Sequence, residues 1–177
     1  VYGRDNIKEI QHFLEQSLRE IRSLIYQLSP PILDDFDIEI ALGFLIEETN
    51  RKHHSRFEYT NSIQGSYQVD HAIKITIYRA VSELITNIIK HSGKKEGQIK
   101  ISYGNDAIQL FVADRGSGFD PNTIAGHEVY GFGLKSMSER IHNFGGSVHI
   151  NSSPGIGTDI YLTVPMRMNK DVGHGTV

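Results

Sequence analysis

The amino-acid sequence predicts an α/β two-layer sandwich, in which helices cover one face of a β-sheet. After a leading helical segment, the later chain alternates helix, hairpin, helix and hairpin patterns. Turn-forming residues mark the two hairpins at Gly104-Asn105-Asp106 and Pro154-Gly155-Ile156-Gly157. Amphipathic helices that alternate with hairpins bury their apolar stripes by packing on a common sheet, so this order predicts two layers.

Length, charge and composition exclude several classes of protein. The 177 residues, 38% of them hydrophobic, fit one domain with an appendage. A net charge of -3 gives no basic surface, so we expect no nucleic-acid partner. The lack of cysteine excludes disulfides and thiolate chemistry and suits a cytoplasmic location. The chain begins at Val1 rather than Met, so we expect a fragment of a longer parent protein. The sequence is compatible with a parent that is anchored in a membrane.

The segment from Asp5 to Ser29 is predicted to be a long helix with a heptad stripe. Pro30-Pro31 ends it. We favour an intermolecular helical bundle over a helix that packs on its own domain, because the stripe is long and terminal. Three regions follow from this reading: a bundle-type helix at 1–34, a globular domain at 35–167 and a disordered tail at 168–177. The stripe consists of Ile7, Ile10, Leu14, Ser17, Ile21, Leu24 and Leu28.

The remaining elements follow from periodicity and turn signals. A central helix is expected over 70–91, with Asp70 as its N-cap and Gly93 after its end. The other predicted elements are a helix at 37–52, strands at 56–62, 97–103 and 107–114, a loop at 115–130, a helix at 133–144, and strands at 147–152 and 158–164.

One face of the central helix carries polar residues that suit a phosphate site. At 100° per residue, Arg79, Glu83, Asn87 and Lys90 fall within a narrow arc away from the apolar stripe. A solvated face with an Arg–Glu pair is the alternative. Asn87 favours a function, because Asn is a poor residue inside a helix and its amide oxygen is a good magnesium ligand.

A strand-ending carboxylate and several glycines form the rest of the motif set. Asp114 precedes Gly116 and Gly118, and its carboxylate can accept a hydrogen bond from an exocyclic amine such as that of adenine. An ordinary type I turn is the alternative. We expect Gly131 and Gly133 to precede a helix directly, where backbone amides bind anions. Thr158 follows a glycine turn and can contact the base edge or a bridging water.

Together these stretches resemble the N, G1, G2 and G3 boxes of the GHKL ATPase and kinase superfamily, which has the Bergerat fold with its mixed sheet. Within it, the chain is most similar to the nitrate-sensor-like and desaturase-regulator-like class of sensor histidine kinases. The segment Gly133-Leu134-Lys135-Ser136-Met137-Ser138-Glu139-Arg140 carries this likeness, with Ser136 in place of the usual Gly. The resemblance covers about Asp5 to Pro165. It implies that 1–34 is the last helix of a dimerisation and phosphoacceptor bundle and that 35–167 is an ATP-binding catalytic domain.

The resemblance implies a role for each residue of the phosphate side. Asn87 would bind Mg²⁺, and Glu83 would assist phosphoryl transfer from ATP. Lys90 and His91 would lie near the phosphates. Gly131 and Gly133 would hinge and cap a lid.

The resemblance also implies how the adenine base of ATP would be bound. Asp114 would bind the adenine amine, Gly116 and Gly118 would shape the pocket, and Thr158 would support the base. Leu134 would stand with them among the nucleotide-binding residues.

The phosphoacceptor histidine that the resemblance implies is not matched in this chain. The family places an acidic residue directly after it, whereas His12 precedes Phe13, and His127-Glu128 lies in the lid. We therefore expect the acceptor upstream of Val1, in a sensor and phosphoacceptor region of the same protein. The resemblance further implies a homodimer and a response regulator as partners.

Two other hypotheses stay open at this stage. The chain could be another GHKL protein, such as an anti-sigma-type serine kinase or a clamp ATPase. It could also be a nucleotide-dependent interaction module without transfer activity.

Overall fold

A computed structural model of the chain describes residues 30–63, 68–121 and 128–166, together with the single residues Ile10, Leu14 and Ser17. The predictions of a long leading helix and of a disordered tail therefore lie almost wholly outside the described residues. Within the described ranges, no helix is long and apolar enough to cross a membrane.

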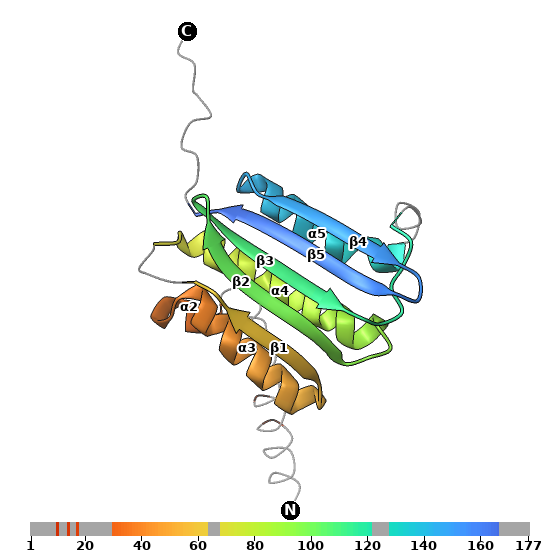
Figure 1. The fold of residues 1–177 in the computed structure, drawn as a ribbon. Helices are drawn as coiled ribbons and strands as arrows, with labels where there is room; N and C mark the ends of the chain where they lie inside the picture. The colour runs from red at the N-terminus through yellow and green to blue at the C-terminus, as the bar shows by residue number, and fades with distance from the viewer. Residues whose placement is uncertain are drawn as a thin grey trace, which may run out of the picture.

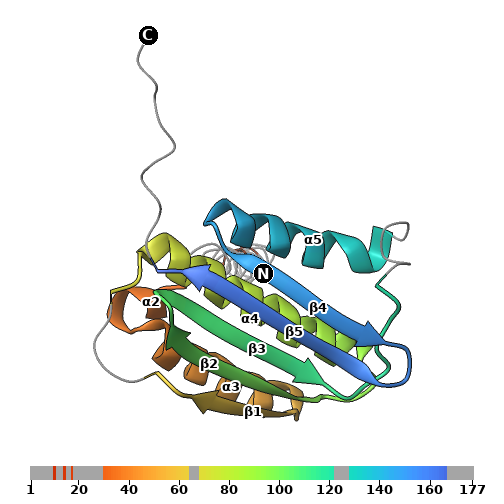
Figure 2. The same ribbon diagram turned by 45° about the horizontal axis from the view of Figure 1, so that its top comes forward.

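The fold is built on one five-stranded mixed sheet in the order β1-β2-β3-β5-β4 (Figure 1). Its strand β1 pairs in parallel with β2, and the other neighbours pair antiparallel. Helices lie against one face of this sheet, as the two ribbon views show (Figure 2). The prediction of an α/β two-layer sandwich is therefore confirmed. The strands are β1 Arg56–Asn61, β2 Glu96–Gly104, β3 Ala107–Asp114, β4 Ser147–Ser153 and β5 Gly157–Pro165.

Four helices make up the second layer in the described ranges: α2 Ile32–Asp35, α3 Ile38–His53, α4 His71–His91 and α5 Glu128–Asn143. The central helix α4 begins as predicted, with the Asp70 side chain accepting a hydrogen bond from the Ala72 amide at 2.8 Å. Its apolar stripe is buried, with Ile73, Ile77 and Leu84 at most 2% exposed. A central helix that is buried along one side gives a rigid support for the polar residues on its other side.

The first hairpin turns as the sequence predicts. The two residues between β2 and β3, Asn105 and Asp106, both have positive φ angles, of 54° and 56°. That conformation suits the right-handed twist of paired strands, and Asn and Asp tolerate it better than most residues. The hairpin therefore fixes the register in which Asp114 ends β3.

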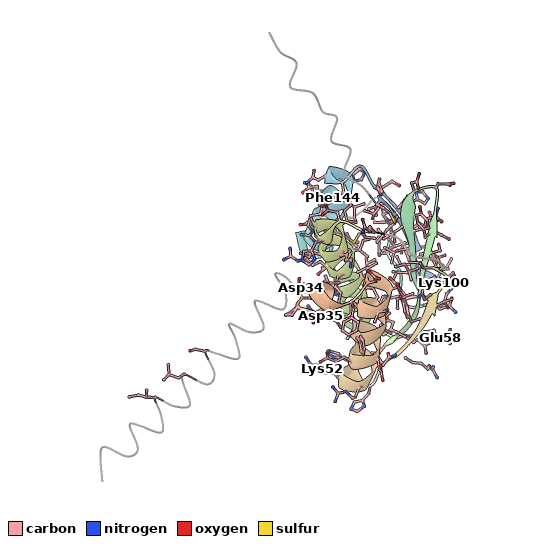
Figure 3. All side chains as sticks on the ribbon, turned by 90° about the vertical axis from the view of Figure 1, so that its left-hand side faces the viewer. Asp34, Asp35, Lys52, Glu58, Lys100 and Phe144 are labelled. Carbon is pink, nitrogen blue, oxygen red and sulfur yellow. The ribbon has the colours of Figure 1, made fainter. Side chains whose placement is uncertain are left out.

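The sheet face opposite the helices carries polar side chains. Figure 3 shows Glu58 and Lys100 on this side, whereas Asp34, Asp35 and Lys52 lie on the helical side. Lys100, Phe111 and Tyr161 are cross-strand neighbours on β2, β3 and β5. The Phe111 and Tyr161 rings lie 4.9 Å apart, with the Lys100 ammonium 5.7 Å from the Phe111 ring centre.

One predicted boundary is wrong. The predicted helix starts at Gly133, with Gly131 in the loop directly before it, but α5 begins at Glu128 and includes both glycines. The anion-binding helix start expected at Gly133 is therefore not present in this conformation. The cost of about 1 kcal/mol for each helical glycine is small beside the burial of Met137 and Ile141, which are fully buried against the core.

Candidate functional site

A cavity of about 60 Å³ opens between the C-terminal half of α4, the ends of β3 and β5, and α5. It has room for a few water molecules, at roughly 10–15 Å³ each. The lining residues come from four separate stretches of the chain: Leu84, Asn87, Ile88, His91, Ser92, Val112, Asp114, Ser117, Gly118, Phe119, Leu134, Thr158 and Ile160.

Asp114 is a buried carboxylate in this wall. It is the last residue of β3, is 6% exposed and stands directly opposite Thr158 of β5. Its Oδ1 atom accepts a hydrogen bond of 2.7 Å from the Gly116 amide. Its second oxygen accepts none from the described part of the chain, so the carboxylate can still accept one hydrogen bond from a ligand.

Burial is the main influence on the protonation of Asp114. It raises the pKa of this carboxyl above its ordinary value, and the nearby Asp159 acts in the same direction. The Gly116 hydrogen bond and the positive charge of Arg115 lower the pKa and partly offset burial. A ligand amine that donates a hydrogen bond to the carboxylate would lower its pKa further, because such a bond favours the charged form.

The glycines after Asp114 allow the chain to pass close to other backbone. A Cβ atom on Gly116 would lie 2.2 Å from the carbonyl oxygen of Ser92, and one on Gly118 would lie 2.1 Å from that of Ser153. The Ser117 amide donates to the Ser92 carbonyl at 2.8 Å, and the Ser117 hydroxyl donates to the His91 carbonyl at 2.8 Å. The turn is thus joined to the end of α4 on one side and to β4 on the other.

The central helix contributes Asn87 and His91 to the same wall. Both side chains are half-buried and line the cavity with Asp114. Lys90, one residue earlier than His91, is exposed and lies outside the lining. The predicted polar arc on α4 is therefore divided, since Asn87 faces the cavity while Lys90 faces solvent.

Glu83 lies beside α5 rather than in the cavity lining. A Cβ atom on Gly133 would lie 2.2 Å from the Glu83 Oε1 atom. Gly133 therefore makes room for the Glu83 carboxylate in this conformation, a function that the sequence did not suggest.

The structure brings six of the predicted residues to one cavity: Asn87, His91, Asp114, Gly118, Leu134 and Thr158. Gly116 supports it through its bond to Asp114. Glu83, Lys90 and Gly133 lie outside the lining, and Gly131 is described only as part of the α5 backbone.

Sequence reasoning missed three polar or aromatic wall residues, namely Ser92, Ser117 and Phe119. They directly follow His91, Gly116 and Gly118, so their place next to motif residues was the available signal.

The oxygen ligands among the described residues suit magnesium only as part of a nucleotide complex. Across residues 30–63, 68–121 and 128–166, no group of three His, Asp or Glu side chains is placed to hold a metal ion. Asn87 supplies a single amide oxygen beside the cavity. Because Mg²⁺ commonly combines one or two protein ligands with phosphate oxygens and water, Asn87 fits the ion as part of a nucleotide complex.

Comparison with known protein families shows the family to which the chain belongs. A family model described as histidine kinase-, DNA gyrase B- and HSP90-like ATPase matches residues 72–168, more than half of the chain. The chain belongs to this family, the GHKL superfamily that the sequence motifs resembled. Membership implies ATP binding.

Among individual relatives, the sensor histidine kinase LiaS of Bacillus subtilis (strain 168) is 27% identical over 160 residues. The match covers 90% of this chain and 43% of LiaS, so the chain spans less than half of that relative. The chain is thus an ATP-binding catalytic domain related to sensor histidine kinases.

Solved structures share the fold at lower identity. The blue-light activated histidine kinase of Erythrobacter litoralis EL346 matches with a TM-score of 0.61 and 16% identity, over 90% of this chain and 51% of that chain. The catalytic domain of histidine kinase ThkA matches with a TM-score of 0.58 and 17% identity, over 73% of this chain and 90% of that chain.

Proposed function

We propose that this chain is the catalytic domain of a two-component sensor histidine kinase of the nitrate-sensor-like and desaturase-regulator-like class. It transfers the γ-phosphate of ATP to a histidine outside this stretch of sequence, for relay to an aspartate of a response regulator. The observation that carries the proposal is the cavity that combines a buried carboxylate, Asp114, with the amide and imidazole of Asn87 and His91.

The base side of the proposal depends on hydrogen-bond polarity. Among the described residues, one carboxylate oxygen of Asp114 accepts no hydrogen bond, and the exocyclic amine of adenine can donate to it. The apolar residues Ile88, Val112 and Ile160 line the same cavity and suit a flat purine ring. Gly116 and Gly118 let the backbone turn close beside the ring.

On the phosphate side, each polar residue of α4 has a separate task. Asn87 provides the protein ligand for Mg²⁺, which neutralises phosphate charge when it is bound with the nucleotide. His91 and Lys90 supply hydrogen bonds and positive charge near the phosphates. Glu83 orients or deprotonates the attacking imidazole, and Gly131 and Gly133 act in the lid. Such a site acts mainly through positioning and electrostatic stabilisation.

The 27% identity to LiaS, a sensor histidine kinase by name, supports the kinase assignment over other members of the family. The partners that follow are an upstream phosphoacceptor and sensor region, a second copy of the whole protein and a response regulator. We assign the domain to the cytoplasm, whether or not its parent is anchored in a membrane.

The test of nucleotide binding is calorimetric titration of Mg-ATP into the chain and into Asp114→Asn. We expect binding by the unmodified chain and a loss of at least tenfold in the variant, because a charge-assisted hydrogen bond is worth about 1.5–3 kcal/mol. Asp35→Asn is a matched control, since Asp35 is an exposed residue of α2 (Figure 3). No binding by the unmodified chain would contradict the proposal.

A second experiment separates binding from transfer. In a protein that includes the upstream histidine, Glu83→Gln should bind Mg-ATP normally but form much less phosphohistidine than the unmodified protein. Equal transfer by both proteins would contradict the role of Glu83. Absence of transfer by the unmodified protein would favour a nucleotide-dependent interaction module.

A further inference from the structure

We infer that Ser152 is a positioning residue that fixes the hydrogen-bond polarity of Thr158, so that the base-binding wall presents only acceptors. This inference rests on the proposed function and assigns base selectivity to a residue outside the cavity lining. It starts from three contacts around one hydroxyl group.

The Ser152 hydroxyl joins three parts of the site. It accepts a hydrogen bond of 3.0 Å from the Phe119 amide, lies 3.1 Å from the Gly157 carbonyl oxygen and lies 2.9 Å from the Thr158 hydroxyl oxygen. Phe119 and Thr158 both line the cavity, whereas Ser152 does not. Ser152 therefore acts on a ligand only through its neighbours.

These three contacts determine the direction of the hydrogen bonds. A hydroxyl group donates one hydrogen bond and accepts two. The Gly157 carbonyl can only accept, so Ser152 donates to it, and the Phe119 amide can only donate. The arrangement is fully satisfied only when Thr158 donates to Ser152. The opposite direction would leave two oxygens, those of Ser152 and Gly157, 3.1 Å apart without a hydrogen between them.

As a consequence, this part of the cavity wall presents only hydrogen-bond acceptors to a ligand. With its proton held by Ser152, the Thr158 hydroxyl offers only lone pairs to a ligand. Asp114, its cross-strand partner, also offers only lone pairs when ionised. Both residues are less than 9% exposed, so water competes little for them. Such a wall favours a purine with an exocyclic amine and disfavours one with only an acceptor oxygen at that position.

The test compares ATP with 6-methoxypurine riboside triphosphate, in which an acceptor oxygen replaces the amine and N1 carries no hydrogen, as in ATP. Titration calorimetry gives the ratio of the two dissociation constants for the unmodified chain and for Ser152→Ala. In the variant, the Thr158 hydroxyl is free to rotate and donate to that oxygen. We expect the preference for ATP to fall by about three- to tenfold, the range of one ordinary hydrogen bond.

Further variants separate polarity from a general loosening of the site. Ser152→Thr keeps the hydroxyl and should keep the preference, whereas Ser152→Cys, which fits the same space but hydrogen-bonds weakly, should reduce it as Ser152→Ala does. In a Thr158→Val chain, adding Ser152→Ala should leave the preference unchanged. Ser153→Ala is the matched control, since its exposed side chain makes no hydrogen bond to the described residues.

Equal weakening of both nucleotides in Ser152→Ala, with an unchanged ratio, would overturn the inference and leave the proposed function standing. No ATP binding by the unmodified chain would overturn the proposed function itself, and this inference with it.

Discussion

At the scale of single residues, Asp114 combines a cost in stability with a use in binding. Burial raises its pKa, so the ionised form destabilises the folded chain at neutral pH. We predict that Asp114→Asn raises the melting temperature at neutral pH, although it weakens ATP binding. Differential scanning calorimetry of both chains measures the first effect, with Asp35→Asn as the control for a lost surface charge.

The difference in stability between the unmodified chain and Asp114→Asn should change with pH in one direction. Between the ordinary pKa of 3.8 and the higher folded value, the folded chain binds more protons at Asp114 than the unfolded chain does. The contribution of Asp114 to stability therefore improves as pH falls through that window, and its cost is complete above it. The advantage of Asp114→Asn should shrink as the solution is acidified. A difference that stays constant down to about pH 4 would contradict the explanation.

Two glycines of the site should respond differently to alanine. At Gly133, the new methyl group would meet the flexible end of Glu83, which can move away. We predict that Gly133→Ala keeps the stability and the ATP affinity of the chain. It should reduce phosphoryl transfer by roughly 10- to 100-fold in a protein with its acceptor histidine, because Glu83 is displaced.

Gly116→Ala provides the contrast, because its methyl group would meet the rigid Ser92 backbone 2.2 Å away. Thermal unfolding and ATP titration should both show a large loss for this variant. If Gly133→Ala lost as much ATP affinity as Gly116→Ala, the distinction between the two positions would be wrong.

At the scale of secondary-structure elements, α5 shows what sequence patterns can and cannot predict. Helix periodicity correctly indicated a helix that ends near Gly145-Gly146. Its start was placed five residues too late, because Gly131 and Gly133 look like helix breakers in sequence. Local propensity does not include the room that Gly133 makes for Glu83, since the two residues are 50 positions apart.

The attachment of α5 should couple stability to nucleotide binding. Ile141 is fully buried against the core, and the same helix carries Leu134 in the cavity wall. We predict that Ile141→Ala lowers the free energy of unfolding by about 2–5 kcal/mol and also weakens ATP binding. Urea unfolding and titration measure the two effects. Ile40→Ala is a matched control, since Ile40 is 45% exposed and should change stability by less than about 0.5 kcal/mol.

At the scale of the whole molecule, one apolar core joins α3, α4, α5 and the sheet. The order of elements and six of the thirteen cavity residues were predictable, because both are local patterns placed in chain order. The Ser152 network was not, because it depends on the register of β4 and β5 and on a turn 33 residues away in sequence. The division of the α4 polar face between Asn87 and Lys90 likewise depends on packing against the sheet.

Binding of Mg-ATP should also raise the stability of the whole folded domain. This effect tests whether Asn87 is a ligand of the magnesium ion. A ligand at 100 times its dissociation constant stabilises the folded state by about 2.7 kcal/mol, which raises the melting temperature by several degrees. We predict a larger rise with Mg-ATP than with ATP and EDTA. In Asn87→Ala the two rises should become equal, because the amide oxygen that links the protein to the ion is lost. A rise in Asn87→Ala that still depends on magnesium would show that other groups hold the ion.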